Sequence, residues 1–385
     1  MPLLQRTIET LSQLIAFPSV SSTSNADISD AIAERLESLG FLVERGEYLD
    51  AQQRRKVNLV ARRDPQSRPS VSRGGLAYFC HTDVVPAIGW TGPGGDPFTA
   101  KIAENHLFGR GSCDMKGSLA VMLTAAAQVT AAEQTAPFWI VCTADEEVGF
   151  EGAKHLVRDS AGYREIVAAQ PLAIIGEPTR LSVVHAHKGI VGCRIISHGR
   201  AAHSSTTDGI NANEAMVPVL QRLLELAGRS RTDPRYQDDR FDPPLLSWNF
   251  GVSDHSDAVN ITPDRSVAWF SLRPMPQIDG EDLIAEAKQA AESVGAEFQR
   301  FEGGRPFWIE PDADCIQEMC ELAGGDPTTV CYGTDGGELT ELQRRVVFGP
   351  GGIAQAHTTD EWIELDQISQ GIDRYTRAIR HWCSG

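Results

Sequence analysis

Three short runs of almost unbroken hydrophobic residues stand out in the first half of the chain. They cover residues 76–80 (LAYFC), 138–144 (FWIVCTA) and 172–177 (LAIIGE), and polar residues follow each run. Strands buried on both faces of a parallel sheet show this pattern. Between the first two runs, residues 116–132 are rich in Ala, Leu and Met and predict a helix. This alternation predicts an α/β fold with a mostly parallel sheet.

The pattern changes after about residue 185. Strands are predicted at 192–197, 245–253, 266–274 and 296–301, and helices at 213–228 and 281–295. Their order, β-α-β-β-α-β, is that of the split ferredoxin-like unit. An α/β pattern then resumes, with a helix at 314–323 and a strand at 346–350. We therefore expect a larger domain of residues 1–185 and 304–385, into which a ferredoxin-like domain of residues 186–303 is inserted.

The polar residues that follow the three hydrophobic runs are candidates for a functional site. They are His81 and Asp83, then Asp145, Glu146 and Glu147, then Glu177. Each group alone is weak evidence, but ligands of open α/β sheets bind at the carboxyl ends of the strands. Burying several carboxylates together is costly unless a cation compensates them. Mixed imidazole and carboxylate ligands suit zinc or related divalent ions, so the sequence predicts a metal site here.

Composition narrows the class of partner. The chain has 35 Lys and Arg residues against 52 Asp and Glu residues, a formal net charge of −17. This acidic surplus argues against nucleic acid and against an anionic membrane surface as partners. Residues 1–20 lack the pattern of a secretory signal, and the eight cysteines contain no CxxC pair. We expect a soluble cytoplasmic protein that acts on a small molecule.

Strings spread over nearly the whole chain resemble the M20 family of dinuclear metallopeptidases and deacylases. They are FCHTDVVP, GRGSCDMKG, CTADEEVG, IIGEPT, HKG, GRAAHSS, SLRP and GPGGIAQAHTTDEW, in the order that the family shows. The strings IIGEPTRLSVVHAHKG and GPGGIAQAHTTDEW look most like the acetylornithine deacetylase branch. The resemblance implies that the larger domain binds metal and catalyses, and that residues 186–303 form a lid or dimerisation domain of a homodimer.

The same resemblance implies two divalent metal ions per chain. One would be held by His81, Asp114 and Glu177, and the other by Asp114, Glu147 and His357. A carboxylate has two oxygens and can bridge ions about 3.5–4 Å apart, which suits Asp114. Asp83 lies on the same side of the strand as His81 and is expected to accept a hydrogen bond from its other ring nitrogen. The ligands suit zinc, with cobalt or manganese as alternatives.

Further roles follow from the resemblance. Glu146 is the expected base, which takes a proton from water and passes it to the leaving amine. His203 is expected to donate a hydrogen bond to the oxyanion in the partner subunit's site, although a surface histidine is the simpler alternative. Asn260 and Arg273 would hold the substrate carboxylate, with a salt bridge as the alternative for the arginine.

A Gly-rich string, residues 332–337, is either a simple turn or a loop that contacts substrate through Thr334. The deacetylase branch often has Glu-Ala where this chain has Asp335-Gly336. The preference for an ornithine side chain therefore stays open.

These features predict metal-dependent hydrolysis of the amide bond of an N-acyl amino acid. The favoured reaction converts N2-acetylornithine to ornithine and acetate, in arginine biosynthesis. Acetylcitrulline, succinyl-diaminopimelate and dipeptides are the alternative substrates. A nucleotide-dependent oxidoreductase is disfavoured, because residues 349–352 (GPGG) do not continue into a GxGxxG motif. A non-catalytic binding protein on the same fold is the last alternative, against which the complete ligand set counts.

Overall fold

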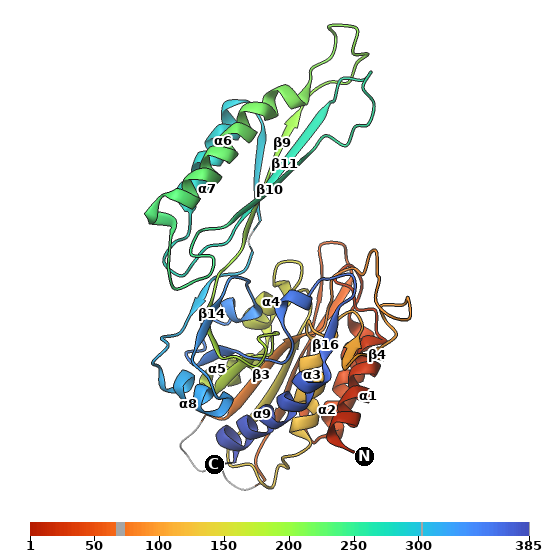
Figure 1. Ribbon diagram of the computed structural model, residues 1–385, viewed down its shortest axis with the longest axis vertical. Helices are drawn as coiled ribbons and strands as arrows, with labels where there is room; N and C mark the ends of the chain where they lie inside the picture. The colour runs from red at the N-terminus through yellow and green to blue at the C-terminus, as the bar shows by residue number, and fades with distance from the viewer. Residues whose placement is uncertain (67–73, 302, 385) are drawn as a thin grey trace. The chain divides into compact units, whose positions relative to one another are not determined.

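The computed structural model describes residues 1–66, 74–301 and 303–384, which form two compact units (Figure 1). Unit 1 consists of Met1–Ala186, Trp308–Thr328 and Thr334–Gly385. Unit 2 consists of His187–Phe307 and Thr329–Gly333. Among the described residues, none of the helices is both long and apolar enough to cross a bilayer.

A nine-stranded sheet, most of whose residues belong to unit 1, has the order β1-β2-β6-β3-β7-β15-β8-β13, with β14 pairing to β8. Its strands are β1 (Leu42–Leu49), β2 (Arg55–Arg63), β3 (Leu76–His81), β6 (Phe138–Thr143), β7 (Leu172–Ile175), β8 (Val184–His187), β13 (Phe307–Trp308), β14 (Thr328–Val330) and β15 (Arg345–Val347). The neighbours β6, β3, β7 and β15 are parallel. Each residue of β3, β6 and β7 is buried, as their unbroken hydrophobic runs predict.

Helices pack against this sheet or against one another. They are α1 (Leu3–Ile15), α2 (Ala26–Ser38), α3 (Lys116–Ala126), α4 (Glu151–Asp159), α5 (Ala161–Ala169), α8 (Asp314–Ala323) and α9 (Leu365–Cys383). Helix α3 contacts both α1 and α9, and all of its residues are buried. A helix covered on all sides has no polar face. It ends at Ala126, short of the predicted residue 132, because Thr130 and Glu133 form a hydrogen-bonded turn.

A second sheet in unit 1 has three short strands, in the order β16-β5-β4. They are β4 (Lys101–Ala103), β5 (His106–Phe108) and β16 (Trp362–Glu364). Strand β16 pairs antiparallel with β5, so a segment near the C-terminus lies beside the segment that leads into α3. These strands are not predicted from the sequence.

Unit 2 has a four-stranded antiparallel sheet in the order β10-β11-β9-β12. Its elements in chain order are β9 (Val191–His198), α6 (Ala212–Thr232), β10 (Trp248–Ser253), β11 (Arg265–Leu272), α7 (Glu281–Ser293) and β12 (Glu297–Phe301). Helix α6 contacts β9, β11 and α7, and α7 contacts β12. The structure confirms the predicted fold class, an α/β sheet together with a β-α-β-β-α-β unit.

Candidate metal centre

Three overlapping groups of side chains in the described part of unit 1 are close enough to hold metal ions, and two of these groups share Asp114. His81, Asp114 and Glu177 form one group, and Asp114, Glu147 and His357 form the other. Within each group the candidate ligand atoms lie within 4.8 Å of one another. These are the two ligand sets expected from the sequence. The structure therefore brings together five side chains that are spread over more than half of the chain.

The fold explains why they meet. His81 is the last residue of β3, while Glu147 and Glu177 follow β6 and β7. Parallel neighbouring strands end at the same edge of the sheet, so these three segments converge there. Asp114 lies just before α3, and His357 follows the short 3-10 helix η3 (Ile353–Gln355).

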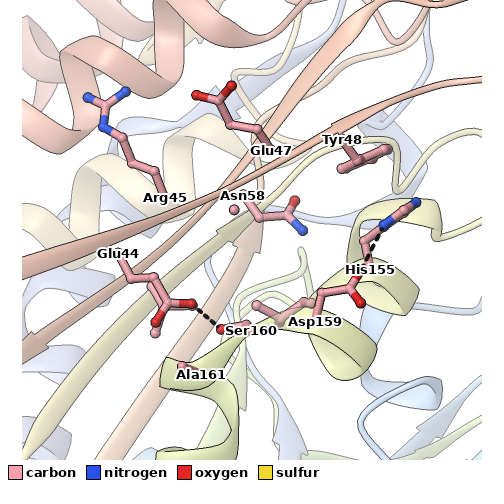
Figure 2. Close-up of a pocket in the computed structure, with 12 residues that line it drawn as sticks. Glu44, Arg45, Glu47, Tyr48, Asn58, His155, Asp159, Ser160 and Ala161 are labelled. Atoms are coloured by element: carbon pink, nitrogen blue, oxygen red, sulfur yellow. Dashed lines mark hydrogen bonds and ion pairs between the residues drawn. The ribbon is translucent and has the colours of Figure 1, made fainter.

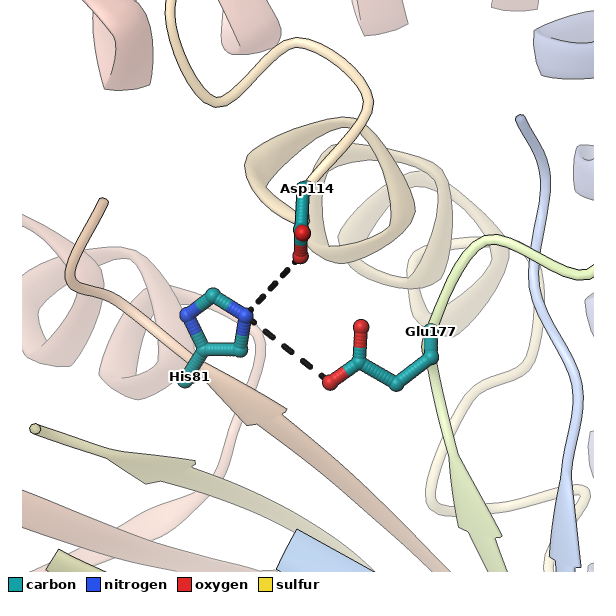
Figure 3. Close-up of side chains that lie close together, drawn as sticks. All are labelled: His81, Asp114 and Glu177. Atoms are coloured by element: carbon teal, nitrogen blue, oxygen red, sulfur yellow. Dashed lines mark hydrogen bonds and ion pairs between the residues drawn. The ribbon is translucent and has the colours of Figure 1, made fainter. Parts of the chain in front are cut away.

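Asp114 faces a different histidine with each of its carboxylate oxygens. Its Oδ1 lies 3.1 Å from Nε2 of His81, and its Oδ2 lies 3.3 Å from Nε2 of His357. Figure 3 shows the first group, in which Nε2 of His81 also lies 3.8 Å from Oε1 of Glu177. In the second group, Nε2 of His357 lies 3.0 Å from Oε2 of Glu147. A carboxylate placed in this way fits a bridge between two cations.

The other ring nitrogen of His81 is held by Asp83, though not by the atom expected. Nδ1 of His81 lies 2.9 Å from the main-chain oxygen of Asp83 and 3.6 Å from its carboxylate. The nearer acceptor is therefore the main chain, which fixes the tautomer that leaves Nε2 facing the cluster. The Asp83 carboxylate accepts hydrogen bonds from the main-chain N–H groups of Glu146 and Glu147 instead. It therefore holds the loop that carries both glutamates.

Asp145, which precedes these glutamates, is occupied by other partners. Its carboxylate forms an ion pair with the buried ammonium of Lys56 and accepts a 2.9 Å hydrogen bond from the Tyr48 hydroxyl. This pairing leaves Glu146 as the candidate base.

Buried charge dominates the electrostatics of the cluster. Burial raises the pKa of Glu177, and the neighbouring charge of Asp114 raises it further. Burial also raises the pKa of Glu146, with contributions from Glu177 and Glu147. Hydrogen bonds to Asp114 and Glu147 raise the pKa of His357 to about 10. The cluster therefore retains protons unless cations replace them, and its donor atoms fit divalent ions.

Asp335 is a buried carboxylate that the sequence analysis did not assign to the site. Its Oδ2 accepts a 2.5 Å hydrogen bond from the hydroxyl of Thr143, the last residue of β6. Burial raises the pKa of Asp335 to about 7, and its charge raises the pKa of both Glu146 and Glu177. The sequence signal for this residue is the Gly-rich string 332–337, which predicts a contact only for the neighbouring threonine.

Thr334, the predicted substrate contact, lies in the same loop as Asp335. Its side chain is fully buried, and its hydroxyl accepts a 3.0 Å hydrogen bond from the Gly336 N–H. That bond caps the 3-10 helix η2 (Asp335–Gly337). The hydroxyl thus has a structural partner in the loop itself.

The other three predicted site residues belong to unit 2. His203 and Asn260 are both exposed and lie close together, because the Ser204 N–H donates a 3.0 Å hydrogen bond to the Asn260 carbonyl. The Ser205 N–H donates to Nδ1 of His203 at 3.2 Å, so the neutral ring carries its proton on Nε2. Arg273 follows β11 and donates its main-chain N–H to the carbonyl of Ser247.

A separate pocket of about 270 Å³ lies between the β1–β2 hairpin and helix α4 (Figure 2). None of the candidate ligands lines it. The ring of Tyr48 stacks on that of His155 at 3.9 Å, and Glu44 accepts hydrogen bonds from Ser160 and Gly162. Because these polar groups are satisfied within the protein, we place the candidate site at the cluster.

Comparisons with known proteins place the chain among metal-dependent peptidases and deacetylases. The profile described as "Peptidase family M20/M25/M40" matches residues 77–381. Acetylornithine deacetylases from Myxococcus xanthus and Erwinia tasmaniensis are 34% and 33% identical to this chain, and each match covers 98% of this chain and 97% of the relative. Among solved structures, a di-peptidase from Saccharomyces cerevisiae has a TM-score of 0.75 at 16% identity, over 99% of this chain and 98% of its own. A dinuclear metal-binding peptidase from Bacillus subtilis has a TM-score of 0.63 at 14% identity, over 99% of this chain and 98% of its own.

Metal binding should release protons. Hydrogen bonds to Asp114 and Glu147 raise the pKa of His357 to about 10, so its ring is protonated at pH 7 without metal. Burial lowers the pKa of His81, but the carboxylates of Asp114 and Asp83 raise it above its ordinary value. A histidine binds metal only when its ring nitrogen is deprotonated. Addition of Zn²⁺ to metal-free protein should release protons, measured with a pH indicator, and affinity should fall as the pH is lowered. His357→Ala should release fewer protons, whereas His155→Ala, outside the cluster, should match the unmodified protein.

Proposed function

Because the chain belongs to peptidase family M20/M25/M40 and is therefore a metal-dependent amidohydrolase, we propose that it hydrolyses the amide bond of an N-acyl amino acid. The favoured substrate is N2-acetylornithine, which gives ornithine and acetate in arginine biosynthesis. Two relatives that match over nearly their whole length are acetylornithine deacetylases, which supports this choice. The observation that carries the proposal is the carboxylate of Asp114, which faces His81 with one oxygen and His357 with the other.

Two divalent ions are the proposed cofactors, with zinc favoured and cobalt or manganese as alternatives. The first metal site is formed by the side chains that would hold the first ion, His81, Asp114 and Glu177. The second metal site is formed by those that would hold the second ion, Asp114, Glu147 and His357. The donor set of imidazole and carboxylate groups supports these metals. Bound ions would lower the pKa of a water molecule and stabilise negative charge that develops on the substrate carbonyl oxygen.

Glu146 is the proposed acid–base residue. It lies beside the cluster, since a carboxylate oxygen of Glu146 is within 4.8 Å of candidate ligand atoms of His81 and Glu147. Its carboxylate takes a proton from water as the water oxygen bonds to the acyl carbon. It then gives this proton to the amide nitrogen as the carbon–nitrogen bond breaks, so that the products are an amine and a carboxylic acid, which at neutral pH exchange a proton to become an ammonium and a carboxylate. The raised pKa of Glu146 suits a group that must both accept and donate a proton.

Unit 2 is proposed to bind the substrate carboxylate and to form a homodimer. Arg273 and Asn260 would hold the carboxylate, because a guanidinium fork binds carboxylates bidentately. Val217 and Leu224 lie two turns apart on α6 and are 61% and 57% exposed, and β10 is an edge strand, which supports pairing of two units. His203 would donate its Nε2 proton to the oxyanion in the partner's site.

A cytoplasmic location without nucleic-acid or membrane partners completes the proposal. The acidic net charge of −17 supports the absence of such partners. All eight cysteines are free and all but Cys331 are buried, which is typical of proteins kept in a reducing compartment.

Replacement of the proposed base should separate catalysis from metal binding. We expect Glu146→Gln to lower kcat about 10²–10⁴-fold, since it removes proton transfer, while the metal content stays unchanged. The matched control is Glu151→Gln, because Glu151 is an exposed residue of α4 that pairs only with Lys154 among the described contacts. Activity and metal content are measured on the same samples. Unchanged turnover in Glu146→Gln would remove it as the base, and full activity after exhaustive chelation would refute the metal-dependent mechanism.

A substrate panel tests the choice of acyl amino acid. Acetylornithine, acetylcitrulline, succinyl-diaminopimelate and several dipeptides are compared by kcat/KM, with products quantified by chromatography. We expect the highest value for acetylornithine. A higher kcat/KM for another acyl amino acid would contradict the choice of acetylornithine but would support the proposed deacylation. A preference for dipeptides would show that the protein is a peptidase.

Mixed dimers test whether His203 acts across the interface. Homodimers of His203→Ala and of Glu146→Gln should both be nearly inactive. A mixed dimer, isolated with two affinity tags after co-expression, should regain activity, because one of its sites combines an intact Glu146 with the partner's intact His203. If His203 acted within its own chain, both sites of the mixed dimer would carry a defect and no activity would return.

A further inference from the structure

The buried carboxylate of Glu361 is surrounded by donors from the segment that carries Asp114. Its Oε1 accepts hydrogen bonds from the N–H groups of Cys113 at 2.9 Å and Asp114 at 3.0 Å. Its Oε2 accepts from the Gly111 N–H at 3.0 Å and from Nη1 of Arg110 at 2.6 Å. Glu361 is only 1% exposed. One carboxylate therefore fixes the main chain on the N-terminal side of Asp114.

Arg110 ties the same segment to the residues that follow His357. Its Nη2 donates a 3.0 Å hydrogen bond to the carbonyl of Thr358, while Nη1 holds Glu361. Arg110 is 2% exposed, so water does not compete for these bonds. The ion pair and its hydrogen bonds join residues 110–114 to residues 358–361, and each of these segments adjoins or contains a proposed ligand of the second metal site.

His357 depends on such support more than the other histidine does. Its φ is 64°, in the left-handed region that non-glycine residues rarely adopt, and its side chain is 51% exposed. Packing therefore does little to hold it. His81, by contrast, ends a central strand and its side chain is 1% exposed.

We propose that Arg110 and Glu361 are positioning residues for the second metal site, which set the distance between Asp114 and His357. This inference rests on the proposed function, because that function assigns both residues as ligands. The guanidinium of Arg110 neutralises the carboxylate of Glu361, so Glu361 brings no uncompensated charge to a cluster that is already acidic. The first site should depend less on the pair, because His81 and Glu177 extend from the ends of β3 and β7.

The test measures metal affinity rather than activity. Arg110→Lys and Glu361→Asp both keep the buried charge pair but lose the geometry of its hydrogen bonds. Zn²⁺ affinities are obtained by titration of metal-free protein against a chromophoric chelator. The unmodified protein should bind two ions. Each variant should bind the second ion about 10–100-fold more weakly, which is the usual cost of losing support behind a ligand, and should keep the first ion.

Arg63→Lys is the matched control. Arg63 is 3% exposed and donates hydrogen bonds to Gln134 and to the carbonyl of Val129, away from the cluster. This variant should lower the thermal unfolding midpoint while it binds both ions as tightly as the unmodified protein. Thermal unfolding of all variants shows that each is folded before metal is added.

The outcomes separate this inference from the proposed function. If the unmodified protein bound no metal, the proposed function would fail. If it bound two ions and Arg110→Lys and Glu361→Asp also bound both with unchanged affinity, only the positioning role would be overturned. Equal weakening of both ions would likewise overturn the assignment of the pair to the second site.

Discussion

The main constraint on unit 1 is the free-energy cost of holding several buried carboxylates close together at the end of a parallel sheet. Asp114, Glu146 and Glu177 have almost no contact with water, and Glu147 and Asp335 lie beside them. A carboxylate removed from water loses its hydration, and neighbouring negative charges increase the cost. Two imidazoles offset only part of this charge. A site of this kind is stable with its groups ionised only when cations occupy it, which makes metal binding a requirement of the arrangement.

The surrounding acidic groups are neutralised by the protein itself. Asp145 pairs with Lys56, and Glu361 pairs with Arg110, all of them buried. Asp83 accepts hydrogen bonds from two main-chain N–H groups and from the Ser21 hydroxyl. These outer carboxylates hold the loops that carry the candidate ligands, and their own negative charge is balanced by an ion pair or by hydrogen bonds. The charge left without compensation therefore lies on the candidate ligands and on Glu146 and Asp335 beside them, so the fold concentrates its demand for cations at one place.

Much of this arrangement could be predicted from the sequence because it follows from local patterns. Unbroken hydrophobic runs identified β3, β6 and β7, and the polar residues after them supplied part of the cluster. The rest depends on contacts between distant segments. Strands β4, β5 and β16 have three residues each, too few to show a period. Glu361 meets Arg110 across 251 positions, and no local signal marks such a pair. The burial of Thr334 likewise follows from tertiary packing, since a Gly-rich string predicts only a turn.

The loop at Asp335 and Gly336 bears on the choice of substrate. Asp335 is anchored through Thr143, and a glutamate would carry its carboxylate one methylene farther from the main chain. A Cβ at position 336 would lie 3.0 Å from the Thr334 hydroxyl and 3.2 Å from Ile175, so an alanine would press on the strand end. The glycine therefore lets the loop lie close against Ile175 at the end of β7. The Glu-Ala pair expected for the deacetylase branch would require this loop to move, so overall identity to those relatives does not by itself transfer their side-chain preference.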